Sequence, residues 1–296
     1  MKVSFSIPAY NEEAVIGKCL EAVLAEISRS GIDAEIVVVN NASTDRTREV
    51  ASSYPGVRVI DECTKGLTHA RAAGMRATTG EIIANVDADV ILLPGWLTTV
   101  VTYFKDNPKR VALSGPFIYY DLTLFEQQLT RFFYWIGYGL HLFNHHILRT
   151  GAMLQGGNFV IRRDAFERVG GFDTSIAFYG EDTDVACRLA KVGTVTWTWD
   201  LPVHSSGRRL RAEGIVTMGW RYTLNHLSII FFHRPATQLY SDIRERFVRE
   251  GQPTGRGEAI RSFRRRLALP RFLYLFARIS RAFDVQKGSR QRGRSQ

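Results

Sequence analysis

Two carboxylates lie one residue apart directly after an apolar run, a pattern able to hold a divalent cation. Asp87 and Asp89 follow the run 82–86. Just past a strand's end, alternate residues can turn toward one ligand, and two carboxylates there repel each other unless a cation lies between them. Carboxylate oxygens suit Mg²⁺ or Mn²⁺, which take further oxygens from substrate phosphates. The pattern favours a metal site, although Asp-x-Asp alone is also typical of a solvated turn.

A second acidic pair, Glu181 and Asp182, begins a later helical segment. A carboxylate within hydrogen-bond reach of an acceptor hydroxyl can take its proton. The first turn of a helix also favours negative charge through the helix dipole, without any catalytic role. The pair is therefore a candidate for base chemistry or for simple stabilisation of the helix.

The elements that must position these residues alternate between strand and helix over the first hundred residues. Apolar runs predict the strands, and apolar residues at helical spacing predict the helices. The expected order is strand 3–7, helix 12–27, strand 35–39, a helix ending at 52 and capped by Ser43 or Thr44, strand 57–60, helix 66–76 and strand 81–86. Such alternation predicts an α/β fold with a parallel sheet and right-handed crossovers. Ligands of these sheets bind beyond the carboxyl ends of the strands, where the polar clusters 8–13, 40–45 and 87–89 fall.

The rest of the chain is less regular. An aromatic-rich segment lies within 117–150, and a strand at 159–161 is followed by helices at 164–169 and 181–189. Beyond Gly251 the composition shifts to Gly, Pro and Arg, as in a linker and a basic tail. We expect a donor-binding half at 1–115, an acceptor-binding half of the same domain at 116–250, and a basic amphipathic tail at 251–296.

The order of several short motifs is more specific than any one of them. The motifs are Ser6-Ile7-Pro8-Ala9-Tyr10-Asn11-Glu12-Glu13, Val37 to Thr47, Asn85 to Asp89, Gly156-Gly157-Asn158-Phe159, Gly170-Gly171-Phe172-Asp173 and Gly180-Glu181-Asp182-Thr183-Asp184. Over roughly residues 1–205 the chain resembles the family 2 glycosyltransferases. The resemblance implies the GT-A fold: a Rossmann-like, mostly parallel sheet flanked by helices, here with a helical C-terminal extension.

The resemblance also implies a nucleotide-diphosphate-sugar site. The residues expected to bind the donor are Pro8, Ala9, Tyr10, Glu12, Asn41, Gly66, Arg71 and Asp87. Asn40-Asn41 stands where the family usually has Asp-Asp, and an amide donates as well as accepts hydrogen bonds. The nucleotide base is therefore open, with UDP expected first and GDP or dTDP as alternatives.

The remaining roles follow from the same resemblance. Asp182 matches the base of an inverting transfer, while Gly157, Asn158 and Glu181 are expected on the acceptor side. Asp87 and Asp89 would hold Mn²⁺ or Mg²⁺, with His204 as a late ligand and Arg208, Arg209 and Arg211 in a closing loop. The motif Gln-x-x-Arg-Trp of processive members is not visible, which favours addition of a single sugar, in envelope glycan or glycolipid synthesis.

Charge and composition bear on location and on rival functions. The formal net charge is +10, and residues 256–296 carry twelve basic residues against two acidic ones, so the rest of the chain is balanced. Three scattered cysteines and no evident signal peptide favour a cytoplasmic setting. Apolar residues recur at helical intervals among the tail arginines, which predicts peripheral contact with the inner face of a membrane, near a glycan or lipid-linked acceptor. The alternatives are a solvated tail, a core or dimer role for the aromatic segment, nucleic-acid binding without sequence preference, an inactive binding protein, and a nucleotidyltransferase.

Overall fold

The computed structural model describes residues 1–143, 153–176, 178–232 and 236–237. Compactness divides the chain into one unit over Met1–Ser241 and a second over Asp242–Gln296. The predicted tail at 251–296 lies outside the described residues, so its predicted membrane contact stays a prediction. Among the helices that are described, none is long and apolar enough to cross a membrane.

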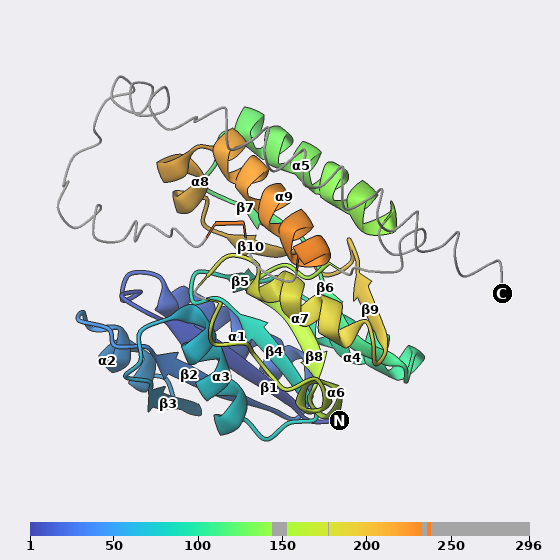
Figure 1. Ribbon diagram of the computed structural model, residues 1–296. Helices are drawn as coiled ribbons and strands as arrows, with labels where there is room; N and C mark the ends of the chain where they lie inside the picture. The colour runs from blue at the N-terminus through green and yellow to red at the C-terminus, as the bar shows by residue number, and fades with distance from the viewer. Residues whose placement is uncertain (144–152, 177, 233–235, 238–296) are drawn as a thin grey trace, which may run out of the picture. The chain divides into compact units, whose positions relative to one another are not determined.

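The strands and helices of the first unit follow one another in the order drawn in Figure 1. They are β1 Val3–Ala9, α1 Ile16–Ser30, β2 Ala34–Asn40, α2 Thr47–Ser52, β3 Val57–Asp61, α3 Leu67–Ala77, β4 Ile82–Val86, β5 Ile91–Leu92, α4 Trp96–Asp106, β6 Arg110–Ser114, β7 Phe117–Tyr119, α5 Leu124–Phe143, β8 Asn158–Arg162, α6 Arg163–Arg168, α7 Glu181–Leu189, β9 Thr194–Trp197, β10 Val203–Ser205, α8 Arg208–Glu213 and α9 Ile215–Phe232.

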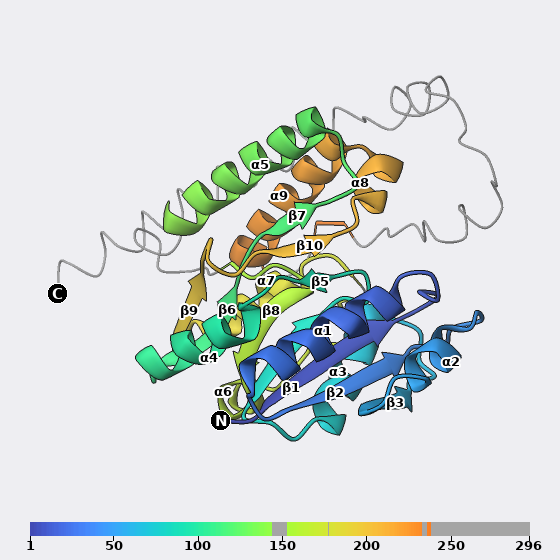
Figure 2. The same ribbon diagram turned by 180° about the vertical axis from the view of Figure 1, so that it is seen from behind.

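A mostly parallel sheet of seven strands, in the order β3-β2-β1-β4-β8-β6-β9, forms the centre of the unit. Strand β8 runs antiparallel to both β4 and β6. Alternate residues of the strands face opposite layers of helices, because side chains alternate along a strand. Phe5 and Val38 pack with α1 and α4 on one face, whereas Val39 packs with α3 and Phe159 with α6 and α7 on the other. The predicted α/β architecture with helices on both faces is confirmed (Figures 1 and 2).

A second sheet of three short strands, β5-β10-β7, connects the large sheet to the helices α5, α8 and α9. Strand β10 pairs in parallel with β7 and antiparallel with β5. Helix α5 packs against α9, and α9 packs in turn against α7. The Glu181-Asp182 pair at the start of α7 is therefore supported from the side of α9.

The loops after β1 and β2 differ from the prediction. The first helix begins at Ile16, and α2 begins at Thr47 with Arg46 as an N-cap that makes no side-chain cap bond, so the predicted caps were wrong. The Ser43 hydroxyl instead accepts a hydrogen bond from the Asn11 amide (3.1 Å), and the Asn11 side-chain oxygen accepts one from the Thr44 amide (2.8 Å). These residues join the two loops at the carboxyl edge of the sheet.

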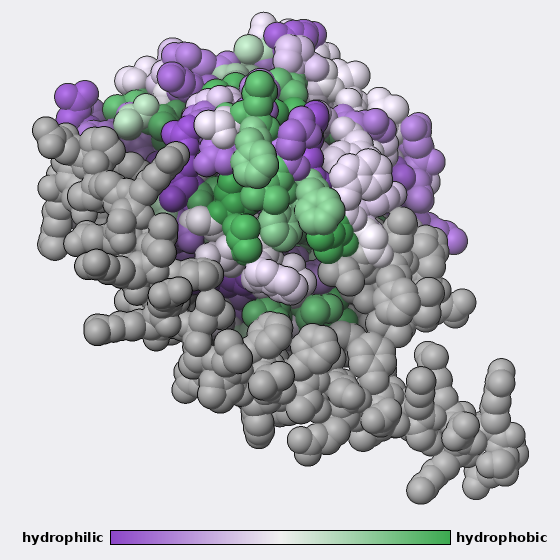
Figure 3. All heavy atoms as spheres, turned by 90° about the horizontal axis from the view of Figure 1, so that it is seen from above, coloured by the Kyte–Doolittle hydropathy of each residue, from purple (hydrophilic) through white to green (hydrophobic). Residues whose placement is uncertain are grey.

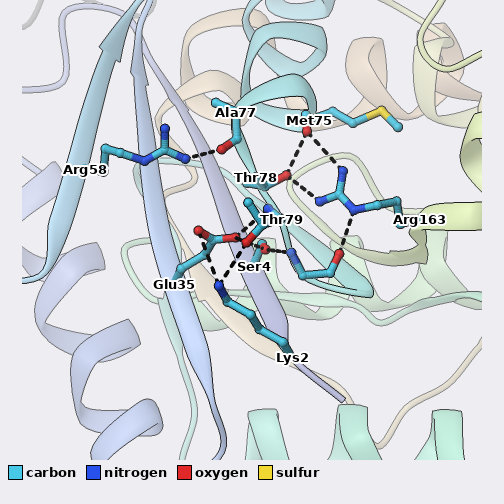
Figure 4. A network of polar contacts seen from close by, with 10 residues as sticks. Lys2, Ser4, Glu35, Arg58, Met75, Ala77, Thr78, Thr79 and Arg163 are labelled. Atoms are coloured by element: carbon cyan, nitrogen blue, oxygen red, sulfur yellow. Dashed lines mark hydrogen bonds and ion pairs between the residues drawn. The ribbon is translucent and has the colours of Figure 1, made fainter.

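A polar network ties together the opposite, amino-terminal edge of the sheet (Figure 4). The Glu35 carboxylate accepts hydrogen bonds from the Ser4 hydroxyl (2.6 Å) and from the Thr79 amide (2.6 Å) and hydroxyl (2.8 Å), and Lys2 lies 3.8 Å away. Arg163 donates to the Gly80 carbonyl at 2.7 Å, so α6 joins the same network. The network links β1, β2, the end of α3 and α6.

Glu35 is expected to make the fold sensitive to acid. Burial raises the pKa of Glu35, but the bonds from Ser4 and Thr79 and the charge of Lys2 outweigh it and lower the pKa to about 2. A depressed pKa contributes stability that is complete above the unfolded value near 4.5 and is lost as pH falls toward 2. Glu35→Gln should cost about 1.5–3 kcal/mol at pH 7 and flatten the dependence of stability on pH between these values. Urea unfolding across that range measures this, with Glu49→Gln, an exposed glutamate, as the control; equal acid sensitivity of Glu35→Gln and the wild type would contradict the assignment.

Candidate active site at the carboxyl edge of the sheet

The turn Gly156-Gly157 lies against the predicted metal motif. Because β8 is antiparallel to β4, Asn158 at its start pairs with Val86 at the end of β4. The Asp87 amide donates to the Gly157 carbonyl at 3.2 Å. A Cβ on Gly157 would lie 2.2 Å from Asp87 Oδ2, and the φ of Gly157 is +84°. Glycine is thus required there both by its backbone conformation and by the nearness of Asp87.

Gly157→Ala is expected to displace the Asp87 carboxylate. Left-handed backbone alone costs about 1–2 kcal/mol for alanine. Gly170→Ala is a matched control, because its φ is +85° and nothing lies within 4 Å of the added Cβ. Both variants should lose similar stability from the backbone, and only Gly157→Ala should also lose Mn²⁺-dependent donor binding. Thermal melts and donor titrations measure the two effects; equal donor binding in both variants would contradict the contact with Asp87.

Arg71 of α3 joins the metal motif to the acidic pair. Its side chain is only 1% exposed, and it donates to Glu181 Oε1 at 2.6 Å and to Asp87 Oδ1 at 3.1 Å. A buried guanidinium needs such partners, because burial of an unpaired charge is very costly. The structure thus places Arg71 between two carboxylates, and its predicted contact with the donor stays a prediction.

Asp182 is held by backbone donors on both oxygens. Its Oδ2 accepts from the Gly156 amide at 3.0 Å and its Oδ1 from the Thr183 amide at 2.7 Å. Burial raises the pKa of Asp182, and the charge of Arg71 opposes the change. Burial and then the charge of Asp182 raise the pKa of Glu181 to about 8, again against Arg71. Because burial outweighs the charge of Arg71, the pair binds protons more strongly than ordinary carboxylates do.

Arg208, the first residue of α8, joins the other half of the metal motif to the loop after β1. It lies 3.2 Å from Asp89 Oδ2 and donates to Glu12 Oε1 at 2.5 Å. Burial lowers the pKa of Arg208, but these carboxylates outweigh it and hold the pKa above its ordinary value. The sequence predicted Arg208 in a closing loop, but nothing in it pairs this residue with one 196 positions earlier.

Asn41, predicted to bind the nucleotide base, holds the loop 62–66 in place through its side-chain hydrogen bonds. The Asn41 side chain donates to the carbonyls of Glu62 (3.0 Å) and Thr64 (2.7 Å) and accepts from the Gly66 amide (2.8 Å). Its backbone amide donates to the carbonyl of Ala9 at 2.8 Å, next to Pro8 near the end of β1. Asn41 thus positions Gly66 and the preceding loop, and its predicted contact with the base stays a prediction.

An aromatic ring and an ammonium group meet at the same loop. Lys65 Nζ donates to the Tyr10 hydroxyl at 2.7 Å and lies 4.1 Å from the centre of that ring. A cation over a ring face is attracted by its quadrupole. Tyr10, predicted to bind the donor, therefore lies beside the positive charge of Lys65, the residue before Gly66.

Asn158, predicted to contact the acceptor, is completely buried. Its amide nitrogen donates to the carbonyls of Gly115 (3.0 Å) and Leu201 (2.8 Å), and its oxygen accepts from Trp96 Nε1 (3.2 Å). With no exposed surface, the side chain can act on an acceptor only through the backbone that it positions. Its neighbour Gly157 is the residue that meets Asp87.

The residues present fit a hard divalent cation. Asp87 and Asp89 offer carboxylate oxygens, the kind of ligand that such a cation prefers, and each carboxylate is paired with one guanidinium, of Arg71 and Arg208 respectively. In the described part of the chain no three His, Cys, Asp or Glu side chains form a metal-binding group. His204 lies in β10 opposite Ile91, and its role as a ligand stays a prediction.

Comparison with known sequences connects this site to one family. A family model described as glycosyl transferase family 2 matches residues 4–170, more than half of the chain. A second, described as N-terminal domain of galactosyltransferase, matches residues 141–201. A glucosyl-dolichyl phosphate glucuronosyltransferase of Haloferax volcanii is 26% identical over 61% of this chain and 59% of its own length. A probable glycosyltransferase of Bacillus subtilis, YdaM, is 30% identical over 73% of this chain and 56% of its own length, so the chain spans less than three fifths of either relative.

Solved structures show the same architecture. A mannosyltransferase from Pyrobaculum calidifontis, in complex with GDP-Man and Mn²⁺, superposes with a TM-score of 0.58 at 23% identity, covering 85% of this chain and 65% of that one. Glucosyl-3-phosphoglycerate synthase from Mycobacterium tuberculosis, in complex with Mn²⁺, UDP-glucose and phosphoglyceric acid, gives 0.53 at 20% identity, covering 77% and 79%. The match over residues 4–170 and the shared architecture lead to one conclusion: the chain belongs to glycosyl transferase family 2 and has the GT-A fold.

Proposed function

We propose that this chain is an inverting glycosyltransferase that moves one sugar from a UDP-sugar to an acceptor hydroxyl, in envelope glycan or glycolipid synthesis. The observation that carries the proposal is the junction made by Arg71, which joins Asp87 of the metal motif to Glu181 beside Asp182. A displacement needs a held leaving group on one side of the anomeric carbon and a proton acceptor on the other. Support for the donor class comes from the two solved relatives that hold GDP-Man and UDP-glucose with Mn²⁺.

In the proposed reaction Asp182 takes the proton of the acceptor hydroxyl. As that oxygen forms its bond to the anomeric carbon, the bond from this carbon to the diphosphate oxygen breaks, and the nucleoside diphosphate leaves with the electron pair. Asp87 and Asp89 would hold a Mn²⁺ or Mg²⁺ ion, whose charge offsets that of the leaving diphosphate. Backbone donors at Gly156 and Thr183 keep the Asp182 oxygens in place.

The roles of the two arginines follow from their charges. Arg71 compensates the charges of Glu181 and Asp87. Because it bonds to both, it holds the acidic pair at a fixed distance from the metal motif. Arg208, which bridges Asp89 and Glu12, is able to turn toward a donor diphosphate because guanidinium binds phosphate well.

The product released tests this proposal most directly. In a panel of nucleotide sugars tested with Mn²⁺, a UDP-sugar should raise the melting temperature of the protein the most. Turnover with that donor should release a nucleoside diphosphate. NMR of the glycosylated product should show an anomeric configuration opposite to that of the sugar in the donor. Release of pyrophosphate would instead identify a nucleotidyltransferase, retained configuration would reject direct displacement, and stabilisation by a GDP-sugar alone would correct the base.

A further inference from the structure

The outward face of α5 is apolar where a surface helix is ordinarily charged. Its exposed positions recur at helical spacing and are Leu124, Phe125, Gln128, Arg131, Phe132, Trp135, Ile136 and Gly139. Phe125 is 76% exposed and Trp135 63%. A helix on the surface of a globular protein ordinarily turns its polar side to water. Over residues 124–139, the part of the helix whose exposure is described, the exposed side carries one charge, Arg131, and no acidic residue.

Helix α9 contributes to the same side of the molecule. Val216 and Trp220 are exposed one turn apart, and α9 packs against α5. Apart from Met1 and Val192, every exposed large apolar side chain of the described residues comes from 118–136, 199 or 216–222. Figure 3, which looks down on the side where α5 and α9 lie in Figure 1, shows apolar side chains gathered there. We call Leu124, Phe125, Phe132, Trp135, Val216 and Trp220 the α5–α9 face.

The composition of this face indicates its partner. Four of its six residues are Trp or Phe, side chains that are typical of the apolar face of a helix lying in the boundary between lipid and water. Arg131 lies within the face and Arg211 is exposed on neighbouring α8, so the nearby charge suits anionic headgroups. The sequence that continues beyond α9 adds twelve basic residues against two acidic ones between 256 and 296. From these observations we propose that the α5–α9 face docks on the surface of an anionic lipid bilayer.

Docking on this face would orient the candidate active site. Helix α9 contacts α7 close to the acidic pair. The hydroxyl of Thr183, the residue after Asp182, lies 3.3 Å from Nδ1 of His226 in α9. Ile229 lies against Gly180, just before the acidic pair. A bilayer held against α5 and α9 therefore lies on the acceptor side, which favours an acceptor that is itself anchored in lipid. This last consequence rests on the proposed function, whereas the docking does not.

Vesicle binding by the full chain tests the proposal. The chain should sediment with vesicles of phosphatidylcholine and phosphatidylglycerol, and its tryptophan emission should shift to the blue. The double variant Phe132→Ser, Trp135→Ser should bind about tenfold more weakly or worse, because two exposed apolar side chains no longer enter the lipid. Val192→Ser, which removes an exposed apolar side chain elsewhere, should bind like the wild type. Arg131→Glu should weaken binding only when phosphatidylglycerol is present.

Three measurements distinguish docking by this face from anchoring by the remainder of the chain and from self-association. Trp135→Phe, Trp220→Phe should keep binding but lose the blue shift, which places these rings in the lipid; an undiminished shift overturns the proposal. Equal vesicle binding by the double serine variant and by Val192→Ser also overturns the proposal, because the remainder of the chain would then be the anchor. A dimer seen by sedimentation velocity that the double serine variant abolishes, without any change in vesicle binding, makes the face a contact between copies and also overturns it. All variants should melt like the wild type, since the altered side chains are exposed.

Discussion

Asp182→Asn is expected to lower kcat by about 10²–10⁴-fold while donor binding stays intact. The amide has nearly the shape of the carboxylate but cannot accept the proton of a hydroxyl. Its oxygen can still accept the hydrogen bond of Thr183 or of Gly156, so the start of α7 should keep its place. Steady-state kinetics combined with calorimetric titration of the donor separates the chemical step from binding.

Asp184→Asn provides the matched control. It removes one negative charge from the same first turn of α7, but Asp184 pairs with Arg188 at 2.6 Å on the same helix rather than with the site. Both variants weaken the interaction with the helix dipole alike. Asp184→Asn should therefore turn over normally. A normal rate in Asp182→Asn, or an equal loss in both variants, would remove Asp182 as the base.

Asp89→Ala is expected to abolish the binding of Mn²⁺ that depends on the donor, and to lower the rate on the order of a thousandfold or more. Without this carboxylate the ion keeps only Asp87 of its two predicted carboxylate ligands, and the charge of the leaving diphosphate is no longer offset. The fold should persist, because Arg208 keeps its partner Glu12. The paramagnetic resonance signal of free Mn²⁺, titrated with and without UDP, reports binding independently of activity.

An exposed aspartate serves as the comparison for this variant. Asp164 of α6 pairs only loosely with Arg168, at 3.5 Å, and both side chains are well exposed. Asp164→Ala should leave the Mn²⁺ titration and the rate unchanged. If Asp89→Ala binds Mn²⁺ in the presence of UDP as well as Asp164→Ala does, then Asp89 is not a ligand.

The fold of the first hundred residues could be predicted from the sequence, because its strands have a clear apolar pattern. Ala34–Asn40 contains the continuous apolar run 36–39 that is typical of a fully buried strand in a parallel sheet. Val3–Ala9 alternates apolar residues with Ser4 and Ser6, and both strands are followed by polar residues at the carboxyl edge. The order of these strands and helices was therefore correct, with errors mainly at helix starts.

The small strands could not be predicted in the same way. β5 has two residues, and β7 and β10 have three each, which is too short for any period to show. Their identity as strands depends on partners far along the chain, such as Val203 beside Leu92 and Phe117. A sequence reveals local preference, whereas these pairings are decided by tertiary structure.

The sequence indicated which residues belong to the candidate site, but it did not determine what those residues contact. Arg71 was expected on the donor side and lies buried between Asp87 and Glu181. Asn41 and Asn158 were expected to bind ligands, which stays a prediction, and their side-chain amides hold backbone carbonyls that the sequence did not identify. The side chain of an arginine or asparagine can form hydrogen bonds with many kinds of group. Residue type therefore does not determine its partner, and only the folded chain does.

The reversed direction of β8 has a consequence for how such enzymes can diversify. Ser114 at the end of β6 pairs with Phe159 near the start of β8, so the segment 115–157 leaves the sheet and returns to it at the same edge. Helix α5, within that segment, is therefore no part of the seven-stranded sheet, whereas Gly156 and Gly157 at the segment's end hold the acidic residues of the site. A chimaera that replaces residues 124–143 and keeps Gly156 and Gly157 would change the layer above the sheet without changing the strands below it, which makes α5 a natural unit for redesign.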